Sequence, residues 1–387
     1  MLRSKKEENV FLTVGILGGG QLAKMLAAAA QKLGLRVHIF ERFSDSPASR
    51  SCDREFVGSW RSWEVLRNFA HSCDVITIES EFVPSSTLHW LHSITPVCPD
   101  PVSLQRLQDK YEQKSVAQQA GFAVAPYRAV ETEADVQAFA EQYGYPVVLK
   151  TRFLGYDGYG NRVVHQPSDI KSALRALQQR EEHTGIFVEA FVNFQKELAL
   201  VYTRDAKGHI RFYPLVETVQ QDGICHKVFA PAVVDADVEK QVQQRAARLA
   251  DALRVVGTMA IELFLVDETT VLFNEIAPRV HNSGHFTIEA CFTSQFENHI
   301  RAITGLPLGA TEMIVPAAAM INILSTREGD PFPQNPAALL EVDKISVHFY
   351  SKERARPRRK MGHVTTVGET RQEVIDRIEQ VAKVLQW

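Results

Sequence analysis

Several features that mark specialised proteins are scarce in this sequence. It has five cysteines in 387 residues, scattered and never spaced as C-x-x-C, so neither a disulfide framework nor a zinc site is predicted, and a reducing cytoplasm fits best. No apolar run approaches the roughly 20 residues of a membrane span. The charged opening, MLRSKKEEN, argues against a secretory signal. A net charge of −3 favours neither nucleic acid nor a membrane surface as a partner.

What the chain does contain is an alternation of strands and helices. Its length exceeds that of one ordinary domain. Residues 10–101 alternate apolar strands with helices, which predicts a small parallel α/β domain. One helix is expected over residues 103–119, and residues 145–190 are typical of a small strand–helix–strand lobe. A long amphipathic helix over residues 236–255 precedes a predicted hairpin.

A glycine motif follows the first predicted strand. Residues 18–23, GGGQLA, fit G-x-G-x-x-A, and Glu41 ends the next strand, where an acid binds ribose in dinucleotide-binding proteins. One hypothesis is therefore an NAD-dependent dehydrogenase. The same turn also suits any tight strand–helix crossing, or a substrate phosphate at the helix N-terminus. The motif alone leaves these alternatives open.

The predicted hairpin, TMAIELFLVD followed by TVLFNEIAP, places two carboxylates face to face. With a turn centred on residues 268–269, Glu262 lies opposite Glu275, and Phe264 lies opposite Phe273 on the same face. Facing like charges destabilise a sheet, and a magnesium ion with its phosphate ligands would resolve the conflict. A shared proton or a neighbouring cation is the alternative. A one-residue slip would send one carboxylate to the other face.

Partners for nucleotide phosphates are also present along the chain. Lys150 ends an apolar strand and is followed by a glycine-dense loop whose backbone N–H groups suit phosphate. Two glutamates at strand ends are candidates for contacts with adenine and ribose. Taken singly, each is equally typical of an ordinary surface. The candidates are Lys150, Gly155, Gly158, Gly160, Glu189 and Glu197.

Together these segments resemble the ATP-grasp superfamily and, more closely, the 5-(carboxyamino)imidazole ribonucleotide synthase family of purine biosynthesis. The motifs are ILGGGQLAKM, DVITIESEFVP, PVVLKTRFLGYDGYGN, VEAFVNFQKEL, NEIAPRVHNSGHFT, YSKE and RPRRKMGH, in family order over nearly the whole chain. The resemblance implies a three-domain ATP-grasp fold with a Rossmann-like N-terminal domain. We expect an N-terminal domain at residues 1–108, a small ATP-grasp lobe at 109–190 and a C-terminal ATP-grasp domain at 191–387. The last subdomain of that C-terminal domain should begin at about residue 313.

The resemblance also implies roles for individual residues. Glu262 and Glu275 should hold magnesium, with manganese as an alternative. Lysines and glutamates with the glycine loop should bind ATP: Lys110, Lys150, Gly155, Gly158, Gly160, Glu189, Val192, Glu197 and Asn274. Bicarbonate and the reacting amine should meet Tyr156, Asp157, Arg279, His281 and Asn282. The ribonucleotide should contact Gln21, Glu79 or Glu81, Lys352, Arg359 and Lys360.

The implied reaction couples ATP hydrolysis to carboxylation of aminoimidazole ribonucleotide by bicarbonate, through carboxyphosphate. The family also implies a cytoplasmic homodimer that passes its product to a separate mutase, since no fused mutase follows residue 387. Two positions depart from the family pattern: Tyr159 stands where Arg or Lys is usual, and Arg358 where Gly is common. The rival hypotheses are another ATP-grasp ligase, the dehydrogenase and a catalytically silent ATP-binding regulator.

Overall fold

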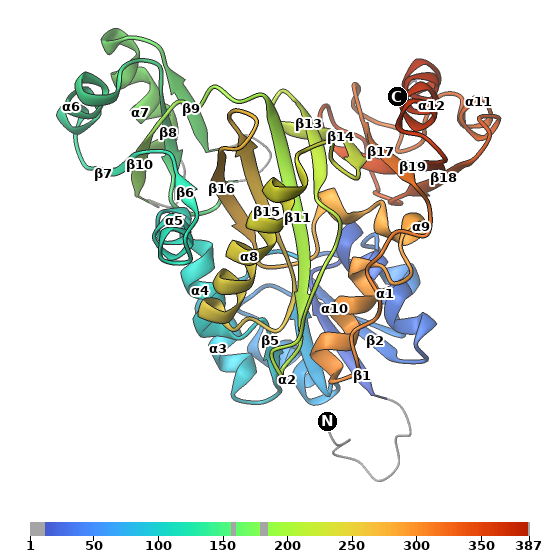
Figure 1. Cartoon of the computed structure of the whole chain (residues 1–387). Helices are drawn as coiled ribbons and strands as arrows, with labels where there is room; N and C mark the ends of the chain where they lie inside the picture. The colour runs from blue at the N-terminus through green and yellow to red at the C-terminus, as the bar shows by residue number, and fades with distance from the viewer. Residues whose placement is uncertain (1–11, 156–159, 179–184, 386–387) are drawn as a thin grey trace.

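The computed structural model describes residues 12–155, 160–178 and 185–385. The first unit, blue in Figure 1, is a parallel sheet of order β3-β2-β1-β4-β5. Strands β1 and β4 are buried along their whole length, as expected of parallel strands covered on both faces. The predicted Rossmann-like N-terminal domain is confirmed. Its elements are β1 (Thr13–Leu17), α1 (Gln21–Lys32), β2 (Arg36–Glu41), η1 (Ser49–Ser51), β3 (Arg54–Val57), α2 (Trp63–His71), β4 (Val75–Ile78), α3 (Ser85–His92) and β5 (Val97–Cys98).

Two helices connect this unit to the rest of the chain, where one was expected. They are α4 (Pro101–Gln108) and α5 (Lys110–Gln119). Asp109 breaks the helix because its backbone is extended and its carboxylate accepts a 3.0 Å bond from the Tyr111 N–H, capping α5. The predicted single helix over 103–119 was therefore wrong. The break places Lys110 in the first turn of α5.

A small four-stranded antiparallel sheet of order β7-β10-β8-β9 forms a separate lobe, at the upper left of Figure 1. Helices α6 and α7 pack on it and bury apolar faces that include Phe139 and Leu174. The lobe begins with β7, earlier than the strand–helix–strand segment that the sequence indicated at 145–190. Its elements are β7 (Tyr127–Val130), α6 (Glu133–Tyr143), β8 (Val147–Thr151), β9 (Asn161–Val164), η2 (Pro167–Asp169), α7 (Ile170–Gln178) and β10 (Ile186–Ala190).

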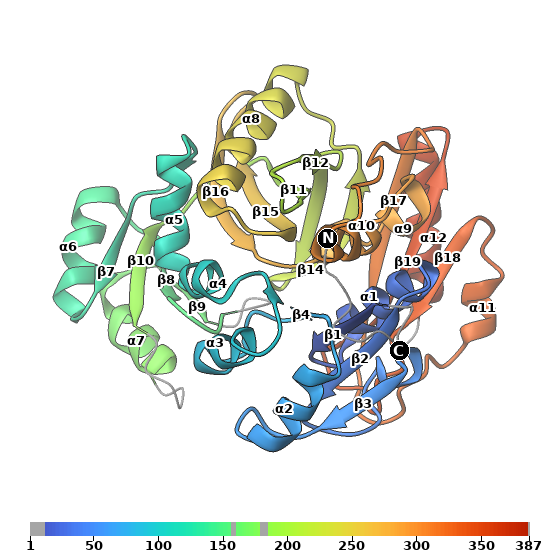
Figure 2. The same cartoon turned by 90° about the horizontal axis from the view of Figure 1, so that it is seen from below.

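The third and largest unit is built on one ten-stranded sheet, with the path β18-β19-β17-β14-β13-β11-β15-β16-β6 and β12 paired to β11. The long helix α8 covers one region of it, and its buried positions Val238, Val242, Leu249 and Leu253 follow the helical repeat. Figure 2 shows this sheet and the N-terminal unit from below.

The bounds in this unit run as follows: β6 (Ala123–Val124), β11 (Lys196–Arg204), β12 (Ile210–Phe212), β13 (Val216–Gln221), β14 (Ile224–Ala230), α8 (Ala236–Leu253), β15 (Gly257–Leu265), β16 (Val271–Ala277), η3 (Asn282–Gly284), α9 (Thr287–Ala290), α10 (Gln295–Thr304), β17 (Ala317–Leu324), α11 (Pro336–Leu340), β18 (Ile345–Phe349), β19 (Lys360–Gly368) and α12 (Arg371–Val384). The C-terminal strands continue the same sheet, because β17 pairs with β14. Within the described ranges, no helix combines the length and apolar character needed to cross a membrane.

Candidate active site

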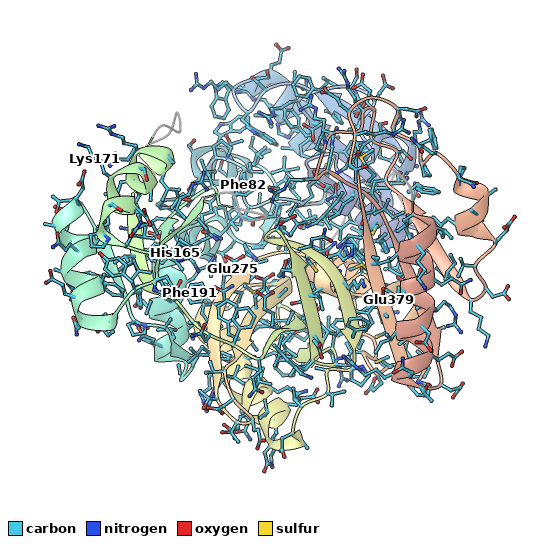
Figure 3. All side chains as sticks on the ribbon, turned by 90° about the horizontal axis from the view of Figure 1, so that it is seen from above. Phe82, His165, Lys171, Phe191, Glu275 and Glu379 are labelled. Carbon is cyan, nitrogen blue, oxygen red and sulfur yellow. The ribbon has the colours of Figure 1, made fainter. Side chains whose placement is uncertain are left out.

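One cleft of about 930 Å³ is lined by residues of all three units. Figure 3 shows Phe82, Phe191 and Glu275 toward the centre of the molecule, and all three line this cleft. Its volume is in the range of sites that hold a small ligand or cofactor. Residues more than 300 positions apart in the sequence, such as Gln21 and Lys360, meet here.

Most of the predicted site residues lie on the wall of this cleft. They are Gln21, Glu79, Glu81, Lys110, Lys150, Gly155, Glu189, Val192, Glu197, Glu262, Asn274, Glu275, Arg279, His281, Asn282, Lys352, Arg359 and Lys360. Gly160 is described but does not line it. Tyr156, Asp157 and Gly158, together with the departure at Tyr159, lie outside the described residues.

The hairpin β15–β16 brings two carboxylates together as predicted, since Glu262 and Glu275 are direct cross-strand partners. The register then shifts by one residue, so Leu263 rather than Phe264 faces Phe273. The predicted pairing of Phe264 with Phe273 was therefore wrong. A β-bulge re-aims side chains, and here both Asn274 and Glu275 line the cleft although they are consecutive.

Opposite shifts in pKa follow from the surroundings of the two carboxylates. Burial raises the pKa of Glu262, and the facing charges of Glu275 and Glu197 raise it further. Burial acts in the same direction on Glu275, but the ammonium group of Lys110, which forms an ion pair with it, and then Lys150 lower its pKa overall. His281 Nε2 lies 3.4 Å from Glu262 Oε1. Cationic compensation is therefore concentrated on Glu275.

This pair fits a divalent cation that arrives with a phosphate ligand. Two half-buried carboxylates face each other, and one of them is held protonated more readily than an ordinary glutamate. The described segments contain no cluster of three or more His, Cys, Asp or Glu side chains placed for a metal. Magnesium takes one or two carboxylates and completes its coordination with phosphate oxygens and water. The donor set thus suits magnesium better than a closed protein site.

A buried group of two lysines and a glutamate lies beside this pair. Glu189 Oε2 lies 2.7 Å from Lys150 Nζ, and Glu189 Oε1 accepts a 2.5 Å bond from Lys114 Nζ. Burial would raise the pKa of Glu189, but the charges of Lys150 and Lys114 lower it overall. Lys150 also donates to Asn274 Oδ1 at 3.2 Å.

Lys114 does not line the cleft but supports it through Glu189, and it was not predicted from the sequence. It is 1% exposed, and burial lowers its pKa to about 8. The signal was present, because Lys110 and Lys114 are four residues apart and share one face of α5. The signal was not recognised because a single helix over 103–119 did not indicate that this face would point into the protein.

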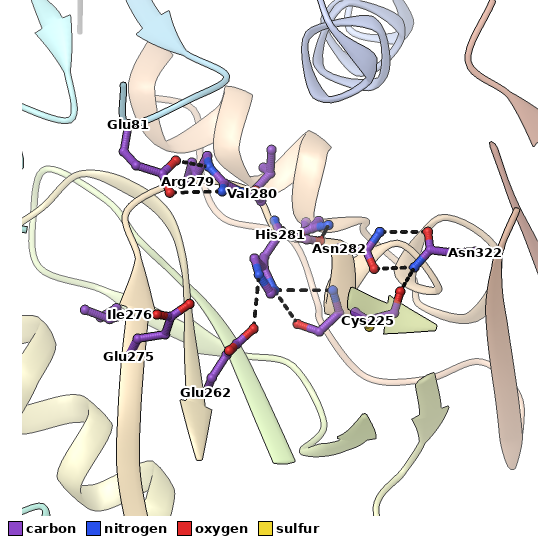
Figure 4. A network of polar contacts seen from close by, with 12 residues as sticks. Glu81, Cys225, Glu262, Glu275, Ile276, Arg279, Val280, His281, Asn282 and Asn322 are labelled. Atoms are coloured by element: carbon purple, nitrogen blue, oxygen red, sulfur yellow. Dashed lines mark hydrogen bonds and ion pairs between the residues drawn. The ribbon is translucent and has the colours of Figure 1, made fainter. Parts of the chain in front are cut away.

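The loop after β16 carries the other predicted catalytic residues (Figure 4). Arg279 forms a two-pronged contact with Glu81 through its Nε and Nη2 atoms, the second at 3.1 Å. His281 Nδ1 lies 2.9 Å from Ser283 Oγ. The structure therefore pairs a predicted bicarbonate ligand, Arg279, with a predicted ribonucleotide contact, Glu81.

The N-terminal glycine loop is filled by the protein's own carboxylates. The Gly20 N–H donates to Glu79 Oε1 at 2.7 Å and the Ala23 N–H to Glu79 Oε2 at 3.1 Å, while the Gly19 N–H donates to Glu41 at 2.8 Å. A Cβ at Gly20 would lie 2.7 Å from Glu79 Oε1, so the glycine makes room for this glutamate. The backbone donors that a dinucleotide or a substrate phosphate would need are occupied.

At the C-terminal edge of the cleft, cationic side chains gather. Lys352, Arg359 and Lys360 line it as predicted, and so do Arg356 and Arg358. Arg358 has a φ of +68°, in the left-handed region that glycine adopts most easily. Arg358 thus takes up a backbone conformation that glycine adopts without strain, at a position where the resemblance led us to expect glycine.

Comparisons with known proteins define the class first. Residues 11–108 match the ribonucleotide synthetase preATP-grasp domain, 115–296 the ATP-grasp domain, and 318–377 the phosphoribosylaminoimidazole carboxylase C-terminal domain. The chain is therefore an ADP-forming ATP-grasp ligase.

The particular family follows from whole-chain similarity. The chain is 35% identical to N5-carboxyaminoimidazole ribonucleotide synthase of Bacillus subtilis, with 94% of each chain covered. It is 38% identical to phosphoribosylaminoimidazole carboxylase of Schizosaccharomyces pombe, covering 96% of this chain and 68% of that protein. It also matches the Aspergillus clavatus synthase with ATP: TM-score 0.89, 36% identity, 97% and 99% coverage. The chain belongs to the N5-carboxyaminoimidazole ribonucleotide synthase family, as the sequence predicted.

Proposed function

We propose that this protein uses ATP and bicarbonate to carboxylate the 5-amino group of aminoimidazole ribonucleotide, giving 5-(carboxyamino)imidazole ribonucleotide in de novo purine biosynthesis. The observation that carries the proposal is the facing pair Glu262–Glu275 between a lysine-rich wall and the loop of Arg279 and His281. A structural relative from Aspergillus clavatus, in complex with ADP and 5-aminoimidazole ribonucleotide, supports it, at 34% identity and a TM-score of 0.88.

ATP is assigned to the part of the cleft between the small lobe and the large sheet. Lys150, and Lys110 on the opposite wall, would meet phosphate oxygens, while Glu189 holds Lys150 in place. Val192 and Glu197 line the same region and would contact the base and the ribose. Because the lysines are already paired with carboxylates, their charges are fixed in position before the nucleotide arrives.

Glu262 and Glu275 would hold magnesium, or manganese in its place. When bound, the ion would neutralise charge on the transferred phosphoryl group. Glu275 is prepared for this role because Lys110 keeps its pKa low. Glu262 would lose its proton on binding the cation, which removes the repulsion between the two facing carboxylates.

The reaction is assigned to the loop beyond the carboxylates. A bicarbonate oxygen attacks the γ-phosphorus and ADP leaves, giving carboxyphosphate. The amine nitrogen then bonds to the carboxyl carbon as phosphate leaves, and the amine gives up one proton. Carboxyphosphate is anionic and easily hydrolysed, so it needs cationic donors and exclusion of water. Arg279 and Asn282 are the proposed hydrogen-bond donors, and the neighbouring His281 is our candidate to receive the proton.

The ribonucleotide phosphate is assigned to the C-terminal basic edge. Lys352, Arg359 and Lys360 are proposed as its ligands, with Gln21 and Glu81 facing the sugar from the N-terminal unit. Burial, and then the neighbouring Arg356, lower the pKa of Arg359, which indicates cations held close together. An anion between them would relieve that repulsion.

We also propose a homodimer in a reducing, cytoplasmic compartment. The five cysteines are all free thiols, which supports such a compartment. Phe292 and Ile314 are 67% and 52% exposed on neighbouring segments, since the Phe292 N–H bonds the Glu312 carbonyl. An apolar surface of this kind supports burial against a second copy. Sedimentation equilibrium measures the association.

The test of the function is ADP release by the purified protein with magnesium and ATP. We expect release to require aminoimidazole ribonucleotide and to fall when bicarbonate is depleted. Release that depends instead on formate and glycinamide ribonucleotide would identify another ATP-grasp ligase. If none of these substrates leads to ADP release although ATP still binds, the protein is a regulator and the proposal is overturned.

A further inference from the structure

Behind the catalytic loop lies a buried pair of asparagine side chains. Asn282 belongs to η3 and lines the cleft, while Asn322 lies in β17 and is 1% exposed. The Asn282 Nδ2 atom donates to Asn322 Oδ1 at 3.0 Å, and Asn322 Nδ2 donates to Asn282 Oδ1 at 2.6 Å. Figure 4 shows the two amides facing each other.

A third group decides which way this pair is oriented. Two facing amides bond equally well if both are turned over together, because each offers one donor and one acceptor. Asn322 Nδ2 also donates to the Cys225 carbonyl at 2.8 Å. A carbonyl only accepts, so the turned-over arrangement would set Asn322 Oδ1 against the Cys225 oxygen. The Cys225 carbonyl therefore fixes Asn322, and Asn322 fixes Asn282.

The consequence concerns what Asn282 presents to the cleft. Its Oδ1 and one N–H are used by Asn322, and the second N–H finds no acceptor among residues 12–155, 160–178 and 185–385. With the pair turned over, Asn282 Oδ1 and Nδ2 would exchange places, and the remaining N–H would point in a different direction. A fixed N–H suits an anion, whereas a carbonyl oxygen would repel one.

We propose that Asn322 is a positioning residue, which holds the Asn282 amide so that its remaining N–H faces the small anionic substrate. The identity of that anion as bicarbonate rests on the proposed function. Asn322 itself touches neither nucleotide nor ribonucleotide, because it does not line the cleft. It acts through Asn282, from a strand that joins the C-terminal segment to the large sheet.

The test compares Asn322→Asp with a matched substitution elsewhere. A carboxylate has nearly the same shape but cannot donate to both the Cys225 carbonyl and Asn282 Oδ1. The control is Asn298→Asp, another fully buried amide, which bonds the Tyr213 hydroxyl and the Gly309 backbone. Asn322→Ala is the second variant, in case the buried carboxylate prevents folding.

For the Asn322 variants we expect the KM for bicarbonate to rise about tenfold, the size typical of a disturbed buried hydrogen bond, while the KM for ATP stays near the wild-type value. The Asn298 variant should leave both KM values unchanged, whatever it does to stability. If both substitutions raise the KM for bicarbonate equally, or neither does, the proposal is overturned.

Crystal structures of the two Asp variants give an answer that does not depend on activity. We expect the Asn282 amide to rotate or shift in the Asn322→Asp protein and to stay in place in the Asn298→Asp protein. An unmoved Asn282 amide in the first variant overturns the inference. Failure of the wild type to release ADP with aminoimidazole ribonucleotide would instead count against the proposed function.

Discussion

The glutamates of the N-terminal glycine loop and those of the large sheet are neutralised in different ways. Glu79 and Glu41 accept hydrogen bonds from backbone N–H groups at the start of α1, where the helix dipole also favours negative charge. Glu262 and Glu275 instead face each other across two strands, and Lys110 compensates one of them. The first arrangement is complete within the protein, whereas we propose that a metal ion completes the second.

This difference explains why the glycine motif is a poor predictor of ligand binding in this protein, whereas the carboxylate pair is a useful one. Backbone N–H groups at a helix N-terminus bind any anion, including a side chain of the same chain. Glu79 fills that position, so the Gly20 and Ala23 N–H groups are occupied without a ligand. Two facing carboxylates have no comparable internal solution here, and their conflict indicates a cation that comes from outside.

The largest expected effect comes from breaking the incomplete pair. Glu275→Gln should reduce kcat on the order of a thousandfold, because several kcal/mol of charge stabilisation depend on this carboxylate. ADP release measured against magnesium concentration tests it. Glu268→Gln, an exposed position in the turn of the same hairpin, is the control and should keep wild-type activity. Equal activity of the two variants would contradict the role given to Glu275.

A stability measurement sharpens the contrast between the two regions. Glu79→Gln should lower the free energy of unfolding by about 1–3 kcal/mol, because glutamine offers one acceptor oxygen where the Gly20 and Ala23 N–H groups use two. Glu262→Gln should not lower it and should raise it by at most about 1 kcal/mol, because glutamine cannot take up the charge that the facing Glu275 repels. Urea unfolding of the ligand-free proteins measures both. The comparison fails if Glu262→Gln is the more destabilised.

The smallest expected effect is the release of a proton when magnesium binds with ADP. Because the pKa of Glu262 is raised, the metal-free site keeps a proton at a pH where an ordinary glutamate has lost it. Binding of magnesium with ADP should displace that proton, so affinity should fall as the pH is lowered through the raised pKa of Glu262. Calorimetry in two buffers of different ionisation enthalpy measures the number of protons released on binding. Identical heats in both buffers would refute this account.

The sequence predicted most of the residues that line the cleft, but not the buried residues that hold them in place. The alternation in TMAIELFLVD and TVLFNEIAP was sufficient to place Glu262 opposite Glu275, since strand pairing depends on local register. It missed the bulge at Asn274, because the alternation along a strand does not show where one extra residue is inserted. Lys114 and Asn322 were missed for a related reason: each bonds a partner at least 40 residues away.

The sequence by itself determined the family, the parallel N-terminal α/β unit and the carboxylate pair, because these depend on residue type and near spacing. The tertiary structure alone decided what the glycine loop holds, which lysines compensate which glutamates, and how the Asn282 amide is turned. Those outcomes arise from contacts between distant segments, where burial makes each charge and each donor find a partner.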